Sequence, residues 1–174
     1  MLLTIPQVLD RETLLECRRL VTDADWVDGR GTAGTQSSQV KNNRQLPEDA
    51  PAATQARALV LRALSAHALF FAAALPKRIY PPLFNRYEGA ANAFGSHIDN
   101  AIRTHPATAR HVRSDLSATL FLSDPDSYDG GELVIEGSFG SQPVKLAAGD
   151  LVLYPASSVH RVEPVTRGLR LACF

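Results

Sequence analysis

The sequence changes in character at Pro76, and this change limits the folds open to the chain. After Pro76, short runs of β-branched, aromatic and alternating residues are separated by turn signals such as Gly130-Gly131 and Gly149-Asp150. A series of short strands of this kind is typical of a sandwich or a barrel. Because a helical half precedes them, we predict an α+β, mainly β fold: a double-stranded β-helix (jelly roll) core buttressed by N-terminal helices.

The expected helices lie before Pro76. Asp10 is a predicted N-cap for a helix that continues to about Val21, with apolar side chains at helical spacing. The longest predicted helix opens at residues 47–51 and continues to about Ala74. His67 lies on this helix, and we expect it to be a structural or surface residue rather than a metal ligand.

Strands are expected on both sides of Pro76. Short ones precede it at residues 1–9, 26–29 and 39–44. Those after it are predicted at residues 78–87, 91–99, 115–123, 132–136, 142–146, 150–155, 159–164 and 169–174. The polar stretch 31–43 is predicted to be a loop, either plain surface or a cover for an active site.

The length and charge of the chain narrow its class. Its 174 residues suffice for one domain, predicted to cover residues 1–174, with helical support over roughly 1–76 and the jelly-roll core over roughly 77–174. Lys and Arg number 18 together, as do Asp and Glu, and the basic residues are scattered. This balance gives no electrostatic footprint for nucleic acid or for an anionic membrane surface. We therefore expect neither as a partner.

Cysteine content and the N-terminus bear on the compartment. Cys17 and Cys173 are far apart and have no partner at metal-ligand spacing, which disfavours a disulfide framework and a structural zinc site. The N-terminus lacks a basic segment and a small-residue cleavage site. The longest apolar stretch, 58–75, is interrupted by Arg62 and His67 and predicts a buried amphipathic helix rather than a membrane span. We expect a cytoplasmic protein.

His97, Asp99 and His160 point to a metal site. His97 and Asp99 end a predicted strand two positions apart, so both project from one face while Ile98 turns away into packing. A third ligand must come from another strand, and His160 follows the hydrophobic run 151–155. Two imidazoles and a carboxylate on one face of an iron leave the opposite face open for substrates. The pattern therefore predicts oxidation by O2 at a non-heme Fe(II), with iron inferred from the mechanism because other divalent metals would compete for these ligands.

Arg170 lies ten residues after His160 and, by strand alternation, faces opposite to its apolar neighbours. A guanidinium inside a barrel needs a partner, and its planar fork suits the distal carboxylate of a 2-oxoacid. A surface Arg on an edge strand is the alternative. Arg161 and Arg167 are rivals by position, but Arg161 directly follows a ligand and should point away from the metal. Arg167 is expected to be solvated in a turn.

Longer stretches around these residues carry a resemblance. One is FNRYEG at residues 84–89, followed by GSHIDNAIR at 95–103. The others are RSDLSATLFLSDP at 113–125 with YDGGEL at 128–133, and AGDLVLYP at 148–155 continuing to His160 and Arg170. Together they resemble the bacterial PKHD-type hydroxylases, relatives of the prolyl 4-hydroxylases, and the resemblance covers essentially residues 1–174.

This resemblance implies an Fe(II)- and 2-oxoglutarate-dependent dioxygenase that hydroxylates a small-molecule or peptide substrate with O2 and converts 2-oxoglutarate to succinate. The two histidines and the aspartate named above would be the iron ligands, and Arg170 would bind the distal carboxylate of 2-oxoglutarate. Tyr87 would lie near that carboxylate. Phe94, three residues before His97, stands where prolyl hydroxylases often carry a Tyr near the substrate. Ascorbate is the reductant expected for such enzymes.

One departure from the family concerns the end of the chain. PKHD-type chains usually continue some tens of residues past the Arg strand with a C-terminal helical part, which is absent after Phe174. An exposed apolar end at residues 171–174 could pair with another chain, so a homo-oligomer is one expectation. His105 and His111 flank Pro106 in a predicted loop. We expect them to be solvated residues or substrate contacts rather than metal ligands.

Two other functions stay open. One is a cupin-like metalloenzyme that uses no 2-oxoglutarate, such as an isomerase or a ring-cleaving dioxygenase. The other is a non-catalytic, ligand-binding jelly roll. Arg170 argues against the first, and the intact set of two histidines and one aspartate argues against the second.

Overall fold

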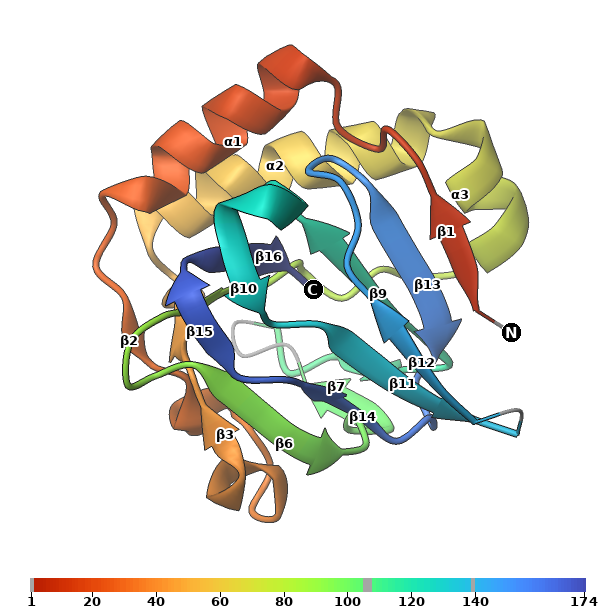
Figure 1. The fold of residues 1–174 in the computed structure, drawn as a ribbon. Helices are drawn as coiled ribbons and strands as arrows, with labels where there is room; N and C mark the ends of the chain where they lie inside the picture. The colour runs from red at the N-terminus through yellow and green to blue at the C-terminus, as the bar shows by residue number, and fades with distance from the viewer. Residues whose placement is uncertain (1, 105–107, 139) are drawn as a thin grey trace.

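Two antiparallel sheets face each other in the computed structural model, which describes residues 2–104, 108–138 and 140–174 (Figure 1). His105 therefore lies outside the described residues. The larger sheet has the order β1 (Leu3–Ile5), β13 (Leu151–Pro155), β9 (Leu116–Phe121), β16 (Arg170–Cys173), β5 (Phe84–Tyr87), β4 (Arg44–Gln45) and β2 (Val27–Asp28). The smaller sheet has the order β12 (Gly140–Val144), β11 (Leu133–Gly137), β14 (His160–Val162), β6 (Ala93–His97) and β3 (Lys41–Asn42). The predicted mainly β, jelly-roll class is confirmed.

Shorter elements complete the fold. The two-stranded pairs are β10 (Tyr128–Gly130) with β15 (Val165–Gly168), and β7 (Ile102–Thr104) with β8 (His111–Arg113). The α-helices are α1 (Arg11–Thr22), α2 (Pro51–Ala66) and α3 (Ala68–Ala74). The 3-10 helices are η1 (Gly29–Thr32), η2 (Ser37–Gln39) and η3 (Pro125–Ser127).

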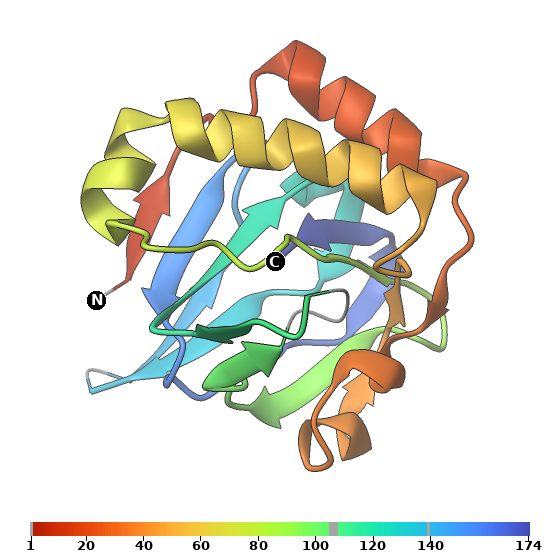
Figure 2. The same cartoon turned by 180° about the vertical axis from the view of Figure 1, so that it is seen from behind.

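Strand alternation explains why the larger sheet is buried on both faces. Along β13, Leu151 and Leu153 pack in one apolar cluster with α1 and α2, which lie side by side over this sheet (Figure 2). Val152 and Tyr154 pack in a second cluster, between the two sheets. All four are nearly fully buried. Because successive side chains of a strand point to opposite faces, a continuous apolar run fits a strand that is covered on both sides.

The helices follow the sequence pattern with one exception. The Asp10 carboxylate accepts a hydrogen bond from the Thr13 N–H at 2.8 Å, as expected of the predicted N-cap. The single helix predicted up to Ala74 is wrong, because α2 ends at Ala66 and α3 leaves it at 82°. His67 has an extended backbone, and its Nδ1 accepts from the Phe70 N–H at 3.3 Å, which caps α3. His67 is therefore structural, as predicted.

Within the described ranges, no single helix is long and apolar enough to cross a bilayer. The α2–α3 pair passes only by combined length and composition.

Three details of the strand prediction need correction. The strand expected at 78–87 begins only at Phe84, because Pro81 and Pro82 have no N–H to give to a ladder. The short strands β7, β8, β10 and β15 were not predicted. Arg167 lies in β15 rather than in a turn, although it is solvent-exposed and its Nε donates to Asp129 at 2.7 Å.

The C-terminal strand β16 is the largest departure from expectation. It lies between β9 and β5 inside the larger sheet, and Leu171 and Cys173 are almost completely buried. Phe174 exchanges both backbone hydrogen bonds with Leu83, each at 2.8 Å. The prediction of an exposed apolar end that pairs with another chain is therefore wrong, since both edges of this strand already have partners.

Candidate metal centre

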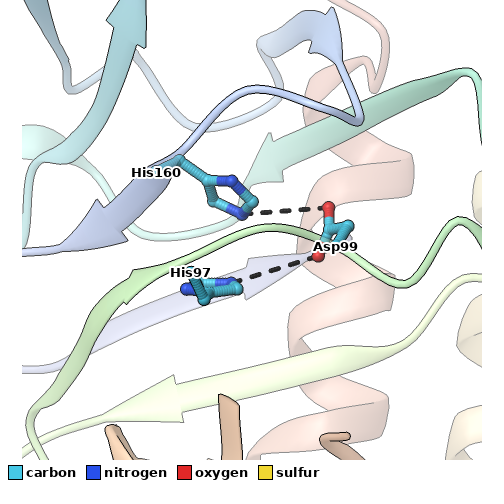
Figure 3. A group of neighbouring side chains, drawn as sticks. All are labelled: His97, Asp99 and His160. Carbon is cyan, nitrogen blue, oxygen red and sulfur yellow. Dashed lines mark ion pairs between the residues drawn. The ribbon is translucent and has the colours of Figure 1, made fainter. Parts of the chain in front are cut away.

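The two histidines of the predicted metal site are direct neighbours across the smaller sheet. His97 is the last residue of β6 and His160 is the first of β14, and the two are paired in register. Asp99 follows two residues after the end of β6. Its carboxylate reaches back towards both imidazoles (Figure 3). The structure thus brings together three side chains that are up to 63 positions apart in the sequence (160 − 97).

The spacing of these side chains leaves room for a cation. The Nε2 of His97 lies 4.0 Å from Asp99 Oδ1, and the Nε2 of His160 lies 3.8 Å from Asp99 Oδ2. One ligand atom from each residue lies within 4.8 Å of the other two. These separations are too long for hydrogen bonds, but they suit three donors around one metal ion. Both imidazoles are nearly buried, while the Asp99 side chain is 30% exposed and gives the site an open side.

Backbone carbonyls fix the orientation of both imidazoles. The Nδ1 of His97 lies 2.8 Å from the Gly95 carbonyl, and the Nδ1 of His160 lies 3.0 Å from the Ser158 carbonyl. Since a carbonyl only accepts, each Nδ1 carries the proton, and each Nε2 keeps a lone pair aimed at the site. Burial, together with the neighbouring His160, lowers the pKa of His97 to about 4. A neutral imidazole is the form that binds a metal.

The Phe94 ring packs against the face of one of these imidazoles. The ring stacks on that of His97 with centroids 3.5 Å apart and planes 13° apart. It also lines the cavity next to the site, which fits the predicted substrate-side position. Ile98 differs from expectation, because it is 50% exposed rather than packed.

Arg170 is buried beside this site without a polar partner for two of its nitrogens. Only 1% of the residue is exposed, and within the described part of the chain its Nε and Nη1 have no hydrogen-bond acceptor. It lines the same cavity, of about 700 Å³, as the two histidines and Asp99. An unpaired buried guanidinium is costly, so this pocket fits a carboxylate ligand.

Tyr87 faces Arg170 across the strands β5 and β16. The two residues are paired in register, and the guanidinium carbon lies 5.1 Å from the phenol ring centroid. Burial raises the pKa of Tyr87, so its hydroxyl stays protonated. That hydroxyl accepts a hydrogen bond from the Asn85 amide at 3.3 Å and can donate its own proton to a ligand.

A glycine makes the close approach around Arg170 possible. Gly131 has a φ of +69°, and a Cβ at this position would lie 2.9 Å from the Tyr128 ring and 3.0 Å from Arg170 Cδ. Any larger residue would press on the guanidinium stem.

The rival arginines lie outside the cavity. Arg161 is held by Glu136 at 2.6 Å and by Glu163 at 2.7 Å, so it points away from the imidazoles as expected. Arg167 pairs with Asp129 at the surface. Of the three arginines considered, Arg170 alone faces the candidate metal site.

Two polar residues near the site were not predicted. Ser117 donates its hydroxyl proton to Asp99 Oδ2 at 2.5 Å. The available signal was the alternation of β9, which puts Ser117 and Thr119 on the inner face. Lys41 is only 5% exposed and lines the same cavity. Its polar neighbourhood in the sequence gave no signal of burial.

Sequence comparison identifies the family. The model of the 2OG-Fe(II) oxygenase superfamily matches residues 82–174, which include every residue of the candidate site except Lys41. The chain belongs to this superfamily and, within it, to the PKHD-type hydroxylases. This oxygenase is 59% identical over 174 residues to a PKHD-type hydroxylase of Burkholderia lata, and the alignment covers 100% of this chain and 76% of the relative. It is 61% identical over 176 residues to a PKHD-type hydroxylase of Xanthomonas axonopodis pv. citri, and that alignment covers 100% of this chain and 77% of the relative.

Solved structures agree with this fold. A prolyl-4-hydroxylase of Pseudomonas putida superposes with a TM-score of 0.64 at 22% identity, over 99% of this chain and 89% of that one. A prolyl hydroxylase of Trichoplax adhaerens, in complex with a hypoxia inducible factor peptide fragment, gives 0.68 at 13% identity, over 99% and 80%. Family membership makes this oxygenase an oxidoreductase that uses Fe(II), 2-oxoglutarate and O2 to hydroxylate a substrate.

Proposed function

We propose that this oxygenase binds Fe(II) through His97, Asp99 and His160 and anchors the distal carboxylate of 2-oxoglutarate on Arg170. One observation carries the proposal: a buried guanidinium with two unpaired nitrogens lines the same cavity as a group of two histidines and one carboxylate. The first feature calls for an anion and the second for a cation. 2-Oxoglutarate meets both, because its distal carboxylate suits the guanidinium and its 2-oxoacid end suits iron.

The residues fit these ligands chemically. Two neutral imidazoles and one carboxylate are a donor set that iron(II) oxygenases use. Iron bound there supplies the activation of O2, while 2-oxoglutarate is oxidised to succinate and CO2. Arg170 fixes the far end of the co-substrate by a bidentate, charge-assisted contact. Tyr87 adds a protonated hydroxyl beside that contact, and the apolar walls between the sheets exclude water.

The same observation ranks the two rivals. A cupin-like metalloenzyme without 2-oxoglutarate gives no role to a buried Arg170 whose Nε and Nη1 lack acceptors among the described residues. A non-catalytic jelly roll gives no role to two imidazoles whose Nδ1 atoms are both fixed so that Nε2 faces Asp99. The 2-oxoglutarate-dependent function accounts for both features.

Several finer features belong to this proposal. Phe94 lines the substrate side of the cavity, and the substrate is a small molecule or a peptide. Ascorbate is the proposed reductant, the cytoplasm the proposed compartment, and residues 1–174 are proposed to act as one domain. A homo-oligomer stays a prediction, now without the support of residues 171–174, which lie inside the larger sheet.

The proposal is tested by product analysis. Protein loaded anaerobically with Fe(II) is exposed to O2 and 2-oxoglutarate, and succinate is measured with and without a panel of peptides, amino acids and small molecules. We expect succinate to form in an iron-dependent manner and to rise when a substrate is present. Iron-dependent oxidation of a substrate without any consumption of 2-oxoglutarate would instead favour a cupin-like metalloenzyme.

A further inference from the structure

Lys41 is a buried cation that neither the iron site nor the 2-oxoglutarate site explains. It lies on β3 with 5% of its surface exposed, in register with Phe94 of β6. No ion pair joins it to a carboxylate of the described residues. A buried charge that lacks an opposite charge is costly, so its retention needs a reason.

The hydrogen bonds of Lys41 leave part of its capacity unused. Its ammonium donates to Thr32 Oγ1 at 3.0 Å and to Gln45 Oε1 at 2.9 Å. An ammonium has three N–H donors, so one remains without an acceptor among the described residues. Lys41 lines the large cavity, and an unpaired N–H at that wall can meet a ligand.

Lys41 is close to the iron site on the side of Phe94. Its Nζ lies 5.3 Å from the Phe94 ring centroid, and that ring stacks on His97. Arg170, by contrast, is on β16 of the opposite sheet. The two buried cations therefore approach the cavity from different walls. Arg170 marks the side of the co-substrate, and Lys41 marks a second side.

Arg103 adds a second positive charge near Lys41. Its guanidinium carbon lies 4.4 Å from the Tyr80 ring, and Arg103 lines both the large cavity and a smaller adjoining one of about 30 Å³ that Lys41 and Phe94 also line. Burial, and then the charge of Arg103, lower the pKa of Lys41, while the more weakly acting Asp99 and Asp28 raise it. Two neighbouring cations repel each other unless an anion lies between them.

The lining of the large cavity is cationic as a whole. Its Lys and Arg residues are Lys41, Lys77, Arg78, Arg103, Arg113 and Arg170, and its carboxylates are Asp99 and Asp115. Asp115 is already paired with Arg113, and Asp99 belongs to the metal site. Lys41 and Arg103 are thus left without a carboxylate partner in the cavity.

We propose that Lys41, assisted by Arg103, binds an anionic group, a carboxylate or a phosphate, of the substrate that this oxygenase hydroxylates. The inference rests on the proposed function, because it assigns the substrate side of the same site. The unused N–H of Lys41 donates to the anion. Because Lys41 Nζ lies 5.3 Å from the Phe94 ring and that ring stacks on His97, an anion bound there brings the rest of the substrate next to the metal centre.

The test uses small anions as probes on protein loaded with Mn(II) and 2-oxoglutarate without O2. Benzoate, phenyl phosphate and neutral benzamide are titrated calorimetrically. We expect benzoate or phenyl phosphate to bind at least about tenfold more tightly than benzamide, as one charge-assisted hydrogen bond provides. The tighter of the two anions distinguishes a carboxylate from a phosphate substrate.

Variants assign that preference to Lys41. Lys41→Met should abolish the preference for the anion, Lys41→Gln serves as a second neutral variant, and Lys41→Arg should keep it. Lys77→Met removes an exposed charge from the same cavity and should change the preference by less than about twofold, since exposed charges are screened. Benzamide binding as tightly as both anions, or a preference that survives in Lys41→Met and Lys41→Gln, would overturn the proposal.

The binding of 2-oxoglutarate separates this proposal from the proposed function. Its dissociation constant should change by less than about twofold in Lys41→Met, because Arg170 anchors it from the other sheet; a loss as large as that of Arg170→Met would assign Lys41 to the co-substrate instead. Failure of 2-oxoglutarate to bind the wild-type protein would count against the proposed function. The probes are therefore also titrated without Mn(II) and 2-oxoglutarate, so that the comparison of wild type with Lys41→Met still decides whether Lys41 selects an anion.

Discussion

Ser117 holds Asp99 by a hydrogen bond of 2.5 Å from its hydroxyl to Oδ2. The two residues belong to different sheets. Ser117 lies on β9 of the larger sheet, and Asp99 follows β6 of the smaller one. The contact links the two sheets at the candidate metal centre. It leaves Oδ1 of the carboxylate facing His97.

Replacement of Ser117 should therefore weaken metal binding. Ser117→Ala frees the carboxylate to rotate, and loss of such a supporting contact typically costs about 10- to 100-fold in metal affinity. Ser141→Ala is the matched control, because Ser141 donates to the exposed Glu136 at 2.6 Å, away from the site. Anaerobic Fe(II) titration measures both. Equal iron affinity in Ser117→Ala and wild type would show that Asp99 needs no support.

Arg170→Met should weaken the binding of 2-oxoglutarate without lowering the stability of the ligand-free protein. We expect the dissociation constant of 2-oxoglutarate to rise by about 30-fold or more, as for loss of one partner of a buried charge pair. The ligand-free protein should not lose stability, because a buried, unpaired charge is replaced by an apolar side chain of similar length. The melting temperature with and without 2-oxoglutarate reports both effects. Arg161→Met, outside the cavity, should keep the full shift caused by 2-oxoglutarate.

The Phe94 ring should contribute to the order of His97. Phe94→Ala removes a stacked pair worth about 0.5–1.5 kcal/mol, so iron affinity should fall by about two- to tenfold. Phe94→Tyr keeps the stacking and should keep the iron affinity. Any change of substrate turnover in Phe94→Tyr then reports on the substrate side alone. Iron affinity that is unchanged in Phe94→Ala would contradict this supporting role.

The charge of Lys41 should give anion binding a defined pH limit. Burial, and then Arg103, lower the pKa of Lys41 to about 8, while Asp99 and Asp28 act in the opposite direction. The ammonium is protonated below this pKa, so the preference for benzoate is present at pH 7 and falls as the pH rises through about 8, by about tenfold per unit well above it. Lys41→Arg stays charged and should show no such decline. A flat profile in the wild-type protein would show that Lys41 does not bind the probe.

His67 should stabilise the junction of α2 and α3. His67→Ala removes the side-chain cap of Phe70 N–H and should lower the free energy of unfolding by about 1 kcal/mol. His67→Asn offers a replacement cap and should recover most of the loss. Urea unfolding measures all three proteins. Equal stability of His67→Ala and the wild type would mean that the break between the helices does not depend on this cap.

The features that could be predicted from the sequence are those with a local cause. The Asp10 cap and the run 151–155 each carry their signal within a few residues, and both elements form as expected. His97 and Asp99 lie two positions apart at the end of a predicted strand, and they reach the same site as alternation predicts, although β6 itself ends at His97. For Arg170, alternation favoured an inward-facing side chain over a surface Arg on an edge strand, and the structure shows it buried.

The rest depends on pairing between distant segments, which the local pattern does not contain. The register of His160 with His97 is set by the whole smaller sheet. Burial of Leu171 and Cys173 depends on β5 and β9, which flank them only in the folded state. Lys41 is buried because the smaller sheet places β3 beside β6, whereas its sequence neighbours over residues 36–45 are polar apart from Val40.

An anaerobic titration of Fe(II)-loaded protein with 2-oxoglutarate tests the iron site most directly. The titration is monitored by the visible charge-transfer absorption that arises when a 2-oxoacid binds iron. The wild-type protein should develop this absorption at saturation with one Fe(II) per chain. Asp99→Ala and His160→Ala should not develop it at the same concentrations, and Arg170→Met should need far more 2-oxoglutarate. Full absorption in Asp99→Ala and His160→Ala, with wild-type affinity, would contradict the assignment of the iron to these side chains.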